Sequence, residues 1–224
     1  MKAIIINRHQ VPNASLLLSV LTESGKIEKL KIPGIFKSRN RNSFFLAPAT
    51  VWSFTISGNY REIMTPREFC LDFTPFDYNS NYRDLSVIGE LLKPLAHMKP
   101  DMENEALYQD MAQTLSDWIC GNSSREEFLL NRFYLLFLKH MGLLHHSVNC
   151  VYCGKAMSDT DKYHLFSGSI CTTCLQQQAC KKDELIPNLW LTHFMENAVN
   201  IALNDIESAK LYRKNILMYL ACSV

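Results

Sequence analysis

The chain has 224 residues, of which 47% are apolar and eight are cysteine, and its formal net charge is +1. This length allows one to three small domains with buried cores. Charged or polar residues interrupt every apolar run well before it could span a bilayer, which excludes the class of membrane-spanning helical proteins. Residues 1–67 nevertheless carry ten lysines and arginines against three acids, a balance of +7 that leaves the remainder at −6. This asymmetry predicts nucleic-acid binding at the amino-terminal end, and the alternative is a solvated basic surface.

The first 75 residues or so have the pattern of short strands joined by turns. Five segments are apolar or alternate apolar with polar residues, at 3–7, 15–22, 27–32, 51–57 and 69–73. Gly25 permits a tight hairpin between the second and third of them. In the fourth, Trp52, Phe54 and Ile56 alternate with polar residues, as in a half-buried strand. Five strands in this length predict a small closed barrel.

From about residue 80 the apolar period becomes helical, which predicts domains at 1–77 and 78–224. Successive apolar stripes start at Leu85, Leu107, Leu129, Trp190 and Tyr212. Pro187 is expected to begin the fourth of these helices, because proline is favoured in a first helical turn. The expected fold class is α+β, with an amino-terminal barrel followed by a helical domain.

Four cysteines, Cys150, Cys153, Cys171 and Cys174, form two Cys-x-x-Cys pairs that are 17 residues apart. This spacing predicts a tetrahedral, structural Zn²⁺ site in a loop at 147–180, with a short hairpin between the pairs. The alternatives are ordinary buried thiols, or a site in which His164 or Cys180 replaces one ligand. A disulfide framework is disfavoured because we recognise no secretory leader, and we expect a cytoplasmic protein.

Signatures of several enzyme classes are absent from the sequence. The eight glycines are never closer than nine residues apart, which excludes Gly-rich phosphate loops and the GxSxG nucleophile motif. A zinc deaminase needs His-x-Glu, but none of the seven histidines has glutamate two places on. His145 and His146 are better interpreted as a surface pair than as catalytic zinc ligands. We therefore expect a protein without catalytic residues.

A basic loop is the strongest candidate for a DNA contact. Lys37, Arg39 and Arg41 place three cations within five residues, separated by side chains that can bond phosphate oxygens. Five further cations are candidates to extend this track: Arg8, Lys26, Lys29, Lys31 and Arg61. Phe36, Phe44 and Tyr60 are candidates for stacking on bases, although Phe44 fits a core position better.

Several short motifs, in the order in which they occur along the chain, resemble the bacterial recombination mediator family RecO. They are the RFxLxxLxxxG run starting at Arg132, the CxxCG run at Cys150, and the segment from Phe166 to Cys174. Towards the amino terminus, the Gly25-Lys26-Ile27 turn, the loop from Gly34 to Arg41 and Leu46-Ala47-Pro48 also resemble the family.

The resemblance implies an amino-terminal OB-fold, a helical domain with an inserted zinc finger, and no catalytic activity. It further implies binding of single- and double-stranded DNA, annealing of complementary strands, and a place near the nucleoid. The implied partners are RecR, the single-stranded-DNA-binding protein and, indirectly, the RecA recombinase.

Arg132 is the position that the resemblance assigns to partner binding, and the alternative is a solvated charge on an amphipathic helix. Asn131 and Leu143 depart from the family pattern, which usually has an arginine and an aromatic residue there. The alternative function is a zinc-ribbon interaction module that binds RNA or a transcription or translation partner. A zinc hydrolase or deaminase ranks third.

Overall fold

The computed structural model describes most of the chain in two compact units, Met1–Cys120 and Gly121–Val224. The described residues are 1–37, 46–56, 63–76, 82–98, 102–119, 126–144, 147–158, 160–164, 167–178, 185–187, 213–218 and 220–221. Arg39, Arg41 and Arg61 lie outside them, as do Phe44 and Tyr60. The domain boundary expected between residues 77 and 78 stays a prediction.

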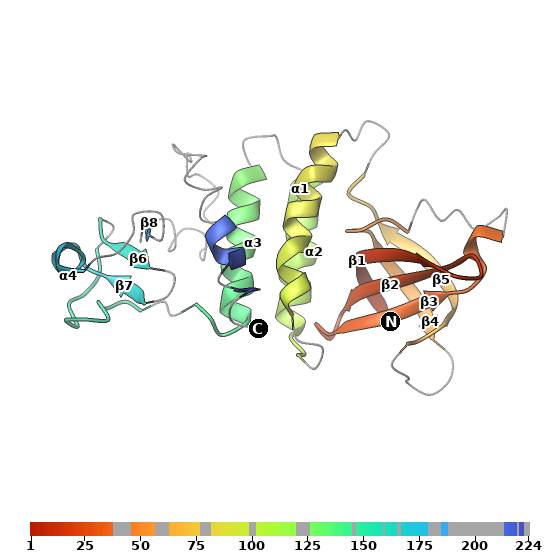
Figure 1. Ribbon diagram of the computed structural model, residues 1–224, viewed down its shortest axis with the longest axis horizontal. Coiled ribbons are helices and arrows are strands. Elements are labelled where there is room, and N and C mark those ends of the chain that lie inside the picture. Colours follow the sequence, from red (N-terminus) through yellow and green to blue (C-terminus); the bar gives the residue numbers. More distant parts are fainter. Residues whose placement is uncertain are drawn as a thin grey trace. The chain divides into compact units, whose positions relative to one another are not determined.

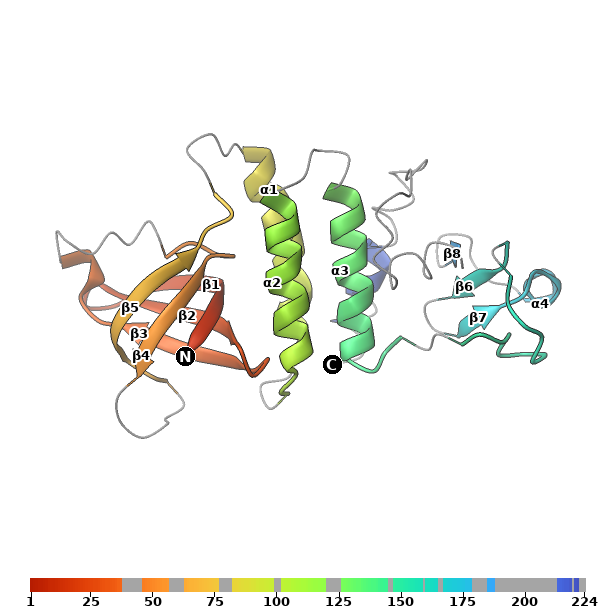
Figure 2. The ribbon, with the colours of Figure 1, turned by 180° about the vertical axis from the view of Figure 1, so that it is seen from behind.

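Five strands form the wall of the first unit. They are β1 (Lys2–Val11), β2 (Ser15–Thr22), β3 (Ile27–Ile32), β4 (Val51–Ile56) and β5 (Pro66–Phe73). Their order is β3-β2-β1-β4-β5, and every neighbouring pair is antiparallel (Figure 1). The strands expected at 15–22 and 27–32 are confirmed with the same bounds. Figure 2 shows β4 and β5 side by side, and β5 forms one edge of the sheet.

A short parallel contact brings the two edges of this sheet together. Met64, just before β5, pairs with Leu30 of β3. The Lys31 N–H donates to the Met64 carbonyl at 2.8 Å, and the Met64 N–H donates to the Lys29 carbonyl at 3.0 Å. The meander β1-β2-β3, the β4-β5 hairpin and this parallel closure give the unit an OB-like form.

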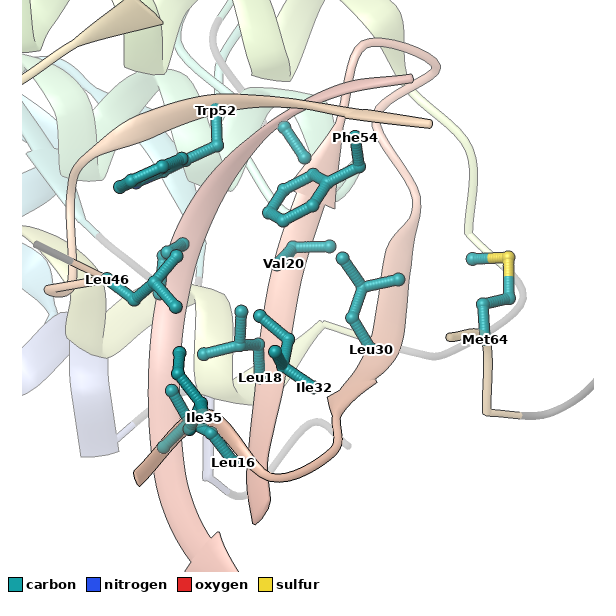
Figure 3. Close-up of a cluster of buried hydrophobic side chains, with 12 residues drawn as sticks. Leu16, Leu18, Val20, Leu30, Ile32, Ile35, Leu46, Trp52, Phe54 and Met64 are labelled. Atoms are coloured by element: carbon teal, nitrogen blue, oxygen red, sulfur yellow. The ribbon is translucent and has the colours of Figure 1, made fainter. Parts of the chain in front are cut away.

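Alternate residues of each strand fill the barrel. Twelve buried apolar residues form its core, and Figure 3 labels ten of them: Leu16, Leu18, Val20, Leu30, Ile32, Ile35, Leu46, Trp52, Phe54 and Met64. The rings of Trp52 and Phe54 lie 5.7 and 6.3 Å from that of Phe69. The inward alternation expected at 51–57 is confirmed, since Ile56 also packs against this core.

The first unit also contains helices α1 (Tyr82–Leu92) and α2 (Glu105–Ile119), with the 3-10 helix η3 (Lys93–His97) after α1. The predicted stripe of α2 is confirmed at Leu107, Met111 and Leu115, which are all completely buried. Leu85, at the start of the α1 stripe, is instead 53% exposed. Within the described residues, no helix is long and apolar enough to cross a membrane.

The second unit contains helix α3 (Glu126–His140) and a small sheet. Eleven successive residues of α3, Phe128–Leu138, are buried, so the helix is covered on all sides rather than along one stripe as expected. Residues 213–218 and 220–221 are also helical, and Arg213 forms a largely buried ion pair with Glu127 of α3. This contact joins the carboxyl-terminal helix to α3 within the unit.

Three short strands and one short helix surround the cysteines. They are β6 (Lys162–His164), β7 (Gly168–Ile170), α4 (Thr172–Gln177) and β8 (Leu185–Pro187), with sheet order β7-β6-β8 (Figure 1). The hairpin expected between the cysteine pairs is confirmed as β6–β7. Pro187 ends a strand instead of beginning a helix, because its segment pairs with β6. The helix expected around Trp190 lies outside the described residues.

Candidate metal centre and nucleic-acid surface

The four cysteines converge on one point in the second unit. Their Sγ atoms all lie within 4.8 Å of one another, and those of Cys153 and Cys171 are 3.6 Å apart. A tetrahedron of thiolates about 2.3 Å from a zinc ion has sulfur–sulfur distances of about 3.8 Å. The arrangement therefore fits a tetrahedral metal ion bound by four thiolates, with no coordination position left for a substrate.

The backbone around each pair explains why the thiols converge. In the first turn, the Cys150 N–H donates to the Lys155 carbonyl at 2.7 Å, and the Gly154 N–H donates to the Cys150 carbonyl at 2.9 Å. Gly154 has φ of +73°, which glycine adopts at little cost. In the second pair, Cys171 caps the start of α4 and Cys174 lies in the helix's first turn. The β6–β7 hairpin then brings the two pairs together.

The thiols do not hold their protons equally. Burial alone would raise the pKa of Cys150, but hydrogen bonds from the backbone of Cys171, Cys153 and Tyr152 outweigh it and lower the pKa to about 6. A hydrogen bond with the Cys153 thiol, together with burial, raises the pKa of Cys174 to about 12. Because thiolates are the metal ligands, a bound cation would displace the protons that remain on this cluster.

Asp161 supports the site in a way that sequence patterns did not indicate. It is 5% exposed, and one carboxylate oxygen accepts hydrogen bonds from the Ser158 N–H and hydroxyl at 2.7 and 2.8 Å. The other oxygen accepts from the Thr172 N–H and hydroxyl at 2.7 and 2.8 Å. Since Thr172 follows the ligand Cys171, Asp161 holds the loop before β6 against the start of α4.

Of the alternative metal ligands considered from the sequence, the structure describes only His164. His164 is buried in β6, and its Nδ1 accepts the Ser167 N–H at 3.1 Å. Among the described residues, only the four cysteines form a group of three or more metal-binding side chains, so His164 is not part of it. Cys180, His145 and His146 fall outside the described residues.

The first unit separates the predicted DNA contacts along the barrel. Lys37 ends the 3-10 helix η1 (Ile35–Lys37), next to the β1–β2 turn, because the Phe36 N–H donates to the Ala14 carbonyl at 3.3 Å. Lys26 lies at the opposite end of β2, in the β2–β3 turn, and its Nζ is 3.4 Å from Glu103 Oε1. Lys37 and Lys26 therefore do not belong to one compact cluster.

Strand register places the intervening cations on one side of the sheet. Residues directly opposite each other share a face, so Asn7, Ser19 and Lys29 form one outward row. His9, Leu17 and Lys31 form the next outward row. These six residues carry two cations and no acid; four are exposed, and Leu17 and Ser19 are half-buried. We call them the cationic outer face.

The same register explains where this surface ends. A third outward row consists of Ile4, Leu21 and Ile27, of which Ile4 and Leu21 are completely buried outside the barrel core. The outer side of β1–β3 thus has an apolar half that is covered and a polar half that is open. Arg8 pairs with the inward-facing Leu18, so it lies on the other face of β1, where its Nη1 donates to the Leu46 carbonyl at 3.4 Å.

The sequence pattern did not predict that His9 belongs to the cationic outer face or that the residues form rows, because strand register is known only once the strands are paired. The only available signal was the alternation of Asn7 and His9 after the apolar start of β1.

Arg132 was assigned to partner binding, with a solvated charge as the alternative. It is 8% exposed in the middle of α3, so the solvated-charge interpretation is wrong.

Comparison with known families extends these observations. The family model described as the carboxyl-terminal part of recombination protein O matches residues 85–215, more than half of the chain. The match includes α3, the four cysteines and Arg213. No curated protein matches the chain.

Proposed function

Because the chain belongs to the recombination protein O family, with a function in DNA recombination and repair, we propose that it is a non-enzymatic mediator. It binds single- and double-stranded DNA, anneals complementary strands, and acts with RecR to load RecA onto DNA that is coated by single-stranded-DNA-binding protein. It works in the cytoplasm, at the nucleoid. Arg132 serves partner binding from within α3.

The observation that carries the DNA-binding part of this proposal is the cationic outer face. Lys29 and Lys31 project from the same side of β3, and the six residues of the face include no acid. Lysines contact phosphates without reading sequence, which suits a protein that must bind any strand. Lys37 extends the basic surface towards the β1–β2 turn, and Arg8, Lys26, Arg39, Arg41 and Arg61 are further proposed DNA contacts.

The metal centre supports a structural role. Four thiolates complete a tetrahedral coordination sphere, so we propose that Cys150, Cys153, Cys171 and Cys174 hold Zn²⁺. When bound, the ion supplies folding free energy and no reactive water. The residues themselves fix where the β6–β7 hairpin and α4 meet.

Annealing of two complementary labelled oligonucleotides, each coated with single-stranded-DNA-binding protein, tests the proposal. The Lys29→Ala/Lys31→Ala variant should anneal more slowly and bind single strands with a log-affinity against log-salt slope flatter by about 1.4, from about 0.7 per phosphate contact. Lys93→Ala is the matched control, because Lys93 lies in η3, outside the strands of the barrel, and is paired with Glu90, and it should retain the slope. A Lys37, Arg39 and Arg41 triple-alanine variant tests the basic loop in the same way.

No annealing by the unaltered protein would contradict the mediator function and favour the zinc-ribbon interaction module. Annealing that survives the double substitution with an unchanged slope would place the DNA elsewhere on the protein.

A further inference from the structure

One aromatic side chain is exposed at the β1–β2 end of the barrel. Phe36 is 44% exposed, whereas Trp52 and Phe54 of the same barrel are 6% and 2% exposed. Among the residues of the first unit whose side chains the structure describes, it is the one exposed aromatic residue. An exposed phenylalanine that does not contribute to the core is available to a ligand.

The backbone holds Phe36 in place. Its neighbour Ile35 is 1% exposed and belongs to the barrel core, where Figure 3 labels it. The Phe36 N–H donates to the Ala14 carbonyl at 3.3 Å, and the Lys37 N–H donates to the Gly34 carbonyl at 3.0 Å. The ring therefore projects from a short turn whose backbone is held by the buried Ile35 and by the bond to Ala14, which reduces the entropy lost when a ligand binds to it.

Charge favours a nucleic-acid ligand over an apolar protein segment. Phe36 adjoins the exposed Lys37 in sequence and the β1–β2 turn in space. The nearest row of the cationic outer face, with Lys31 and His9, pairs with Leu17, three residues along the chain from Ala14. Three residues of chain span at most about 10 Å, so a single strand bound at Lys31 is within reach of the ring.

We propose that Phe36 is a stacking platform for an unpaired base at the β1–β2 end of the barrel, which makes this end specific for single-stranded nucleic acid. The inference rests on the DNA-binding function proposed above. Lysines bind the phosphates of single and double strands alike, but a ring can stack only on a base that is not already stacked within a duplex. Phe36 thus adds a preference that the cations alone do not provide.

The test measures binding of the full-length protein to a fluorescein-labelled oligothymidylate, to the same length of abasic backbone, and to a duplex. Phe36→Ala should weaken binding to the oligothymidylate by about 5- to 150-fold, the range for loss of one base–aromatic stack. Its salt slope should stay unchanged. Binding to the abasic strand and to the duplex should change less than twofold.

Two further variants separate stacking from folding. Phe36→Leu keeps an apolar side chain on the turn but removes the aromatic face, so it should show the same loss as Phe36→Ala. Phe36→Trp should retain the affinity of the unaltered protein. Lys37→Ala is the neighbouring charge control and should flatten the salt slope by about 0.7.

Unchanged oligothymidylate binding by Phe36→Leu would overturn the stacking inference, and so would an equal loss on the abasic strand. Either result would leave the proposed function standing. Absence of single-strand binding by the unaltered protein would overturn both.

Discussion

At the scale of single residues, Asp161 does most to explain how two separated cysteine pairs form one site. Burial alone would raise the pKa of its carboxyl, but hydrogen bonds from Ser158 and Thr172 outweigh burial and hold the pKa well below its ordinary value. A carboxylate that accepts four hydrogen bonds stays charged and fixes two chain segments at once. The segments it joins are the loop before β6 and the first turn of α4.

We predict that Asp161→Asn lowers the free energy of unfolding of the second unit by about 1–3 kcal/mol, because an amide nitrogen would face an N–H or hydroxyl donor. The variant should also bind metal about 10-fold more weakly, since residues that orient ligands typically affect metal affinity by that factor or more. Competition with a chromophoric chelator measures the affinity. Thr173→Ala, which removes an exposed hydroxyl beside Thr172, is the control and should match the unaltered protein.

The depressed pKa of Asp161 also fixes the sign of its pH dependence. Its stabilising contribution is fully present above the unfolded-state pKa of about 4 and is lost as the pH falls towards the lower folded-state pKa. The difference in unfolding free energy between the unaltered protein and Asp161→Asn should therefore narrow as the pH falls from 5 to 3. Protonation of the cysteines affects both proteins, so the difference between them is the readout. A constant difference would contradict this account.

Residues whose roles follow from spacing could be predicted from the sequence, and those whose roles follow from packing could not. The four cysteines were identified because two short motifs already place the thiols in pairs. Asp161 was missed because its partners are three and eleven positions away and meet it only after the hairpin forms. Arg132 was interpreted as either a partner contact or a solvated charge, and burial of the whole of α3 removes the second option.

At the scale of elements, the β2–β3 hairpin determines how the barrel meets the segment that leads into α2. Gly25 has φ of +75°, and a methyl group at its Cα would overlap the backbone of Asn104. The Asn104 side chain and carbonyl accept the Leu107 N–H at the start of α2, at 3.1 and 3.0 Å. Close approach of the hairpin therefore requires a residue without a side chain.

We predict that Gly25→Ala lowers the free energy of unfolding of the first unit by at least about 2 kcal/mol, from backbone strain at positive φ and the overlap with Asn104. Gly34→Ala is a matched control, since Gly34 has φ of +63° but no atom within 4 Å of the added methyl group. It should lose only the strain contribution, about 1–2 kcal/mol. Urea unfolding measures both variants, and equal losses would show that the hairpin does not pack tightly on Asn104.

Elements with a clear period were predicted well, and those with a short or mixed pattern were not. The bounds of β2 and β3 followed from apolar runs between turn residues. β8 has only three residues, and its pairing with β6 is a long-range contact that no local pattern reports. α3 is apolar around most of its circumference, so its sequence pattern predicts a helix but does not predict that the helix is completely buried.

At the scale of the whole molecule, charge and metal are divided between the two units. The excess of +7 in residues 1–67 lies in the barrel unit, and all four cysteines of the metal centre lie in the second. Each unit has its own means of stabilisation, since the barrel core is built from residues 3–64 alone. DNA binding by the barrel and stabilisation by the metal are therefore expected to be separable.

We predict that removing the metal with a chelator under reducing conditions unfolds the surroundings of the cysteines and leaves the barrel intact. Binding of a structural zinc ion is worth on the order of 10 kcal/mol, which exceeds what three-residue strands and a six-residue helix can supply. Hydrogen exchange followed by mass spectrometry should show lost protection in 147–178 and retained protection in β1–β5. Cys171→Ser should reproduce this pattern without a chelator, because it removes a buried ligand. Retained protection at 147–178 would mean that packing alone holds the cysteine site, whereas loss across both units would mean that the barrel depends on the metal as well.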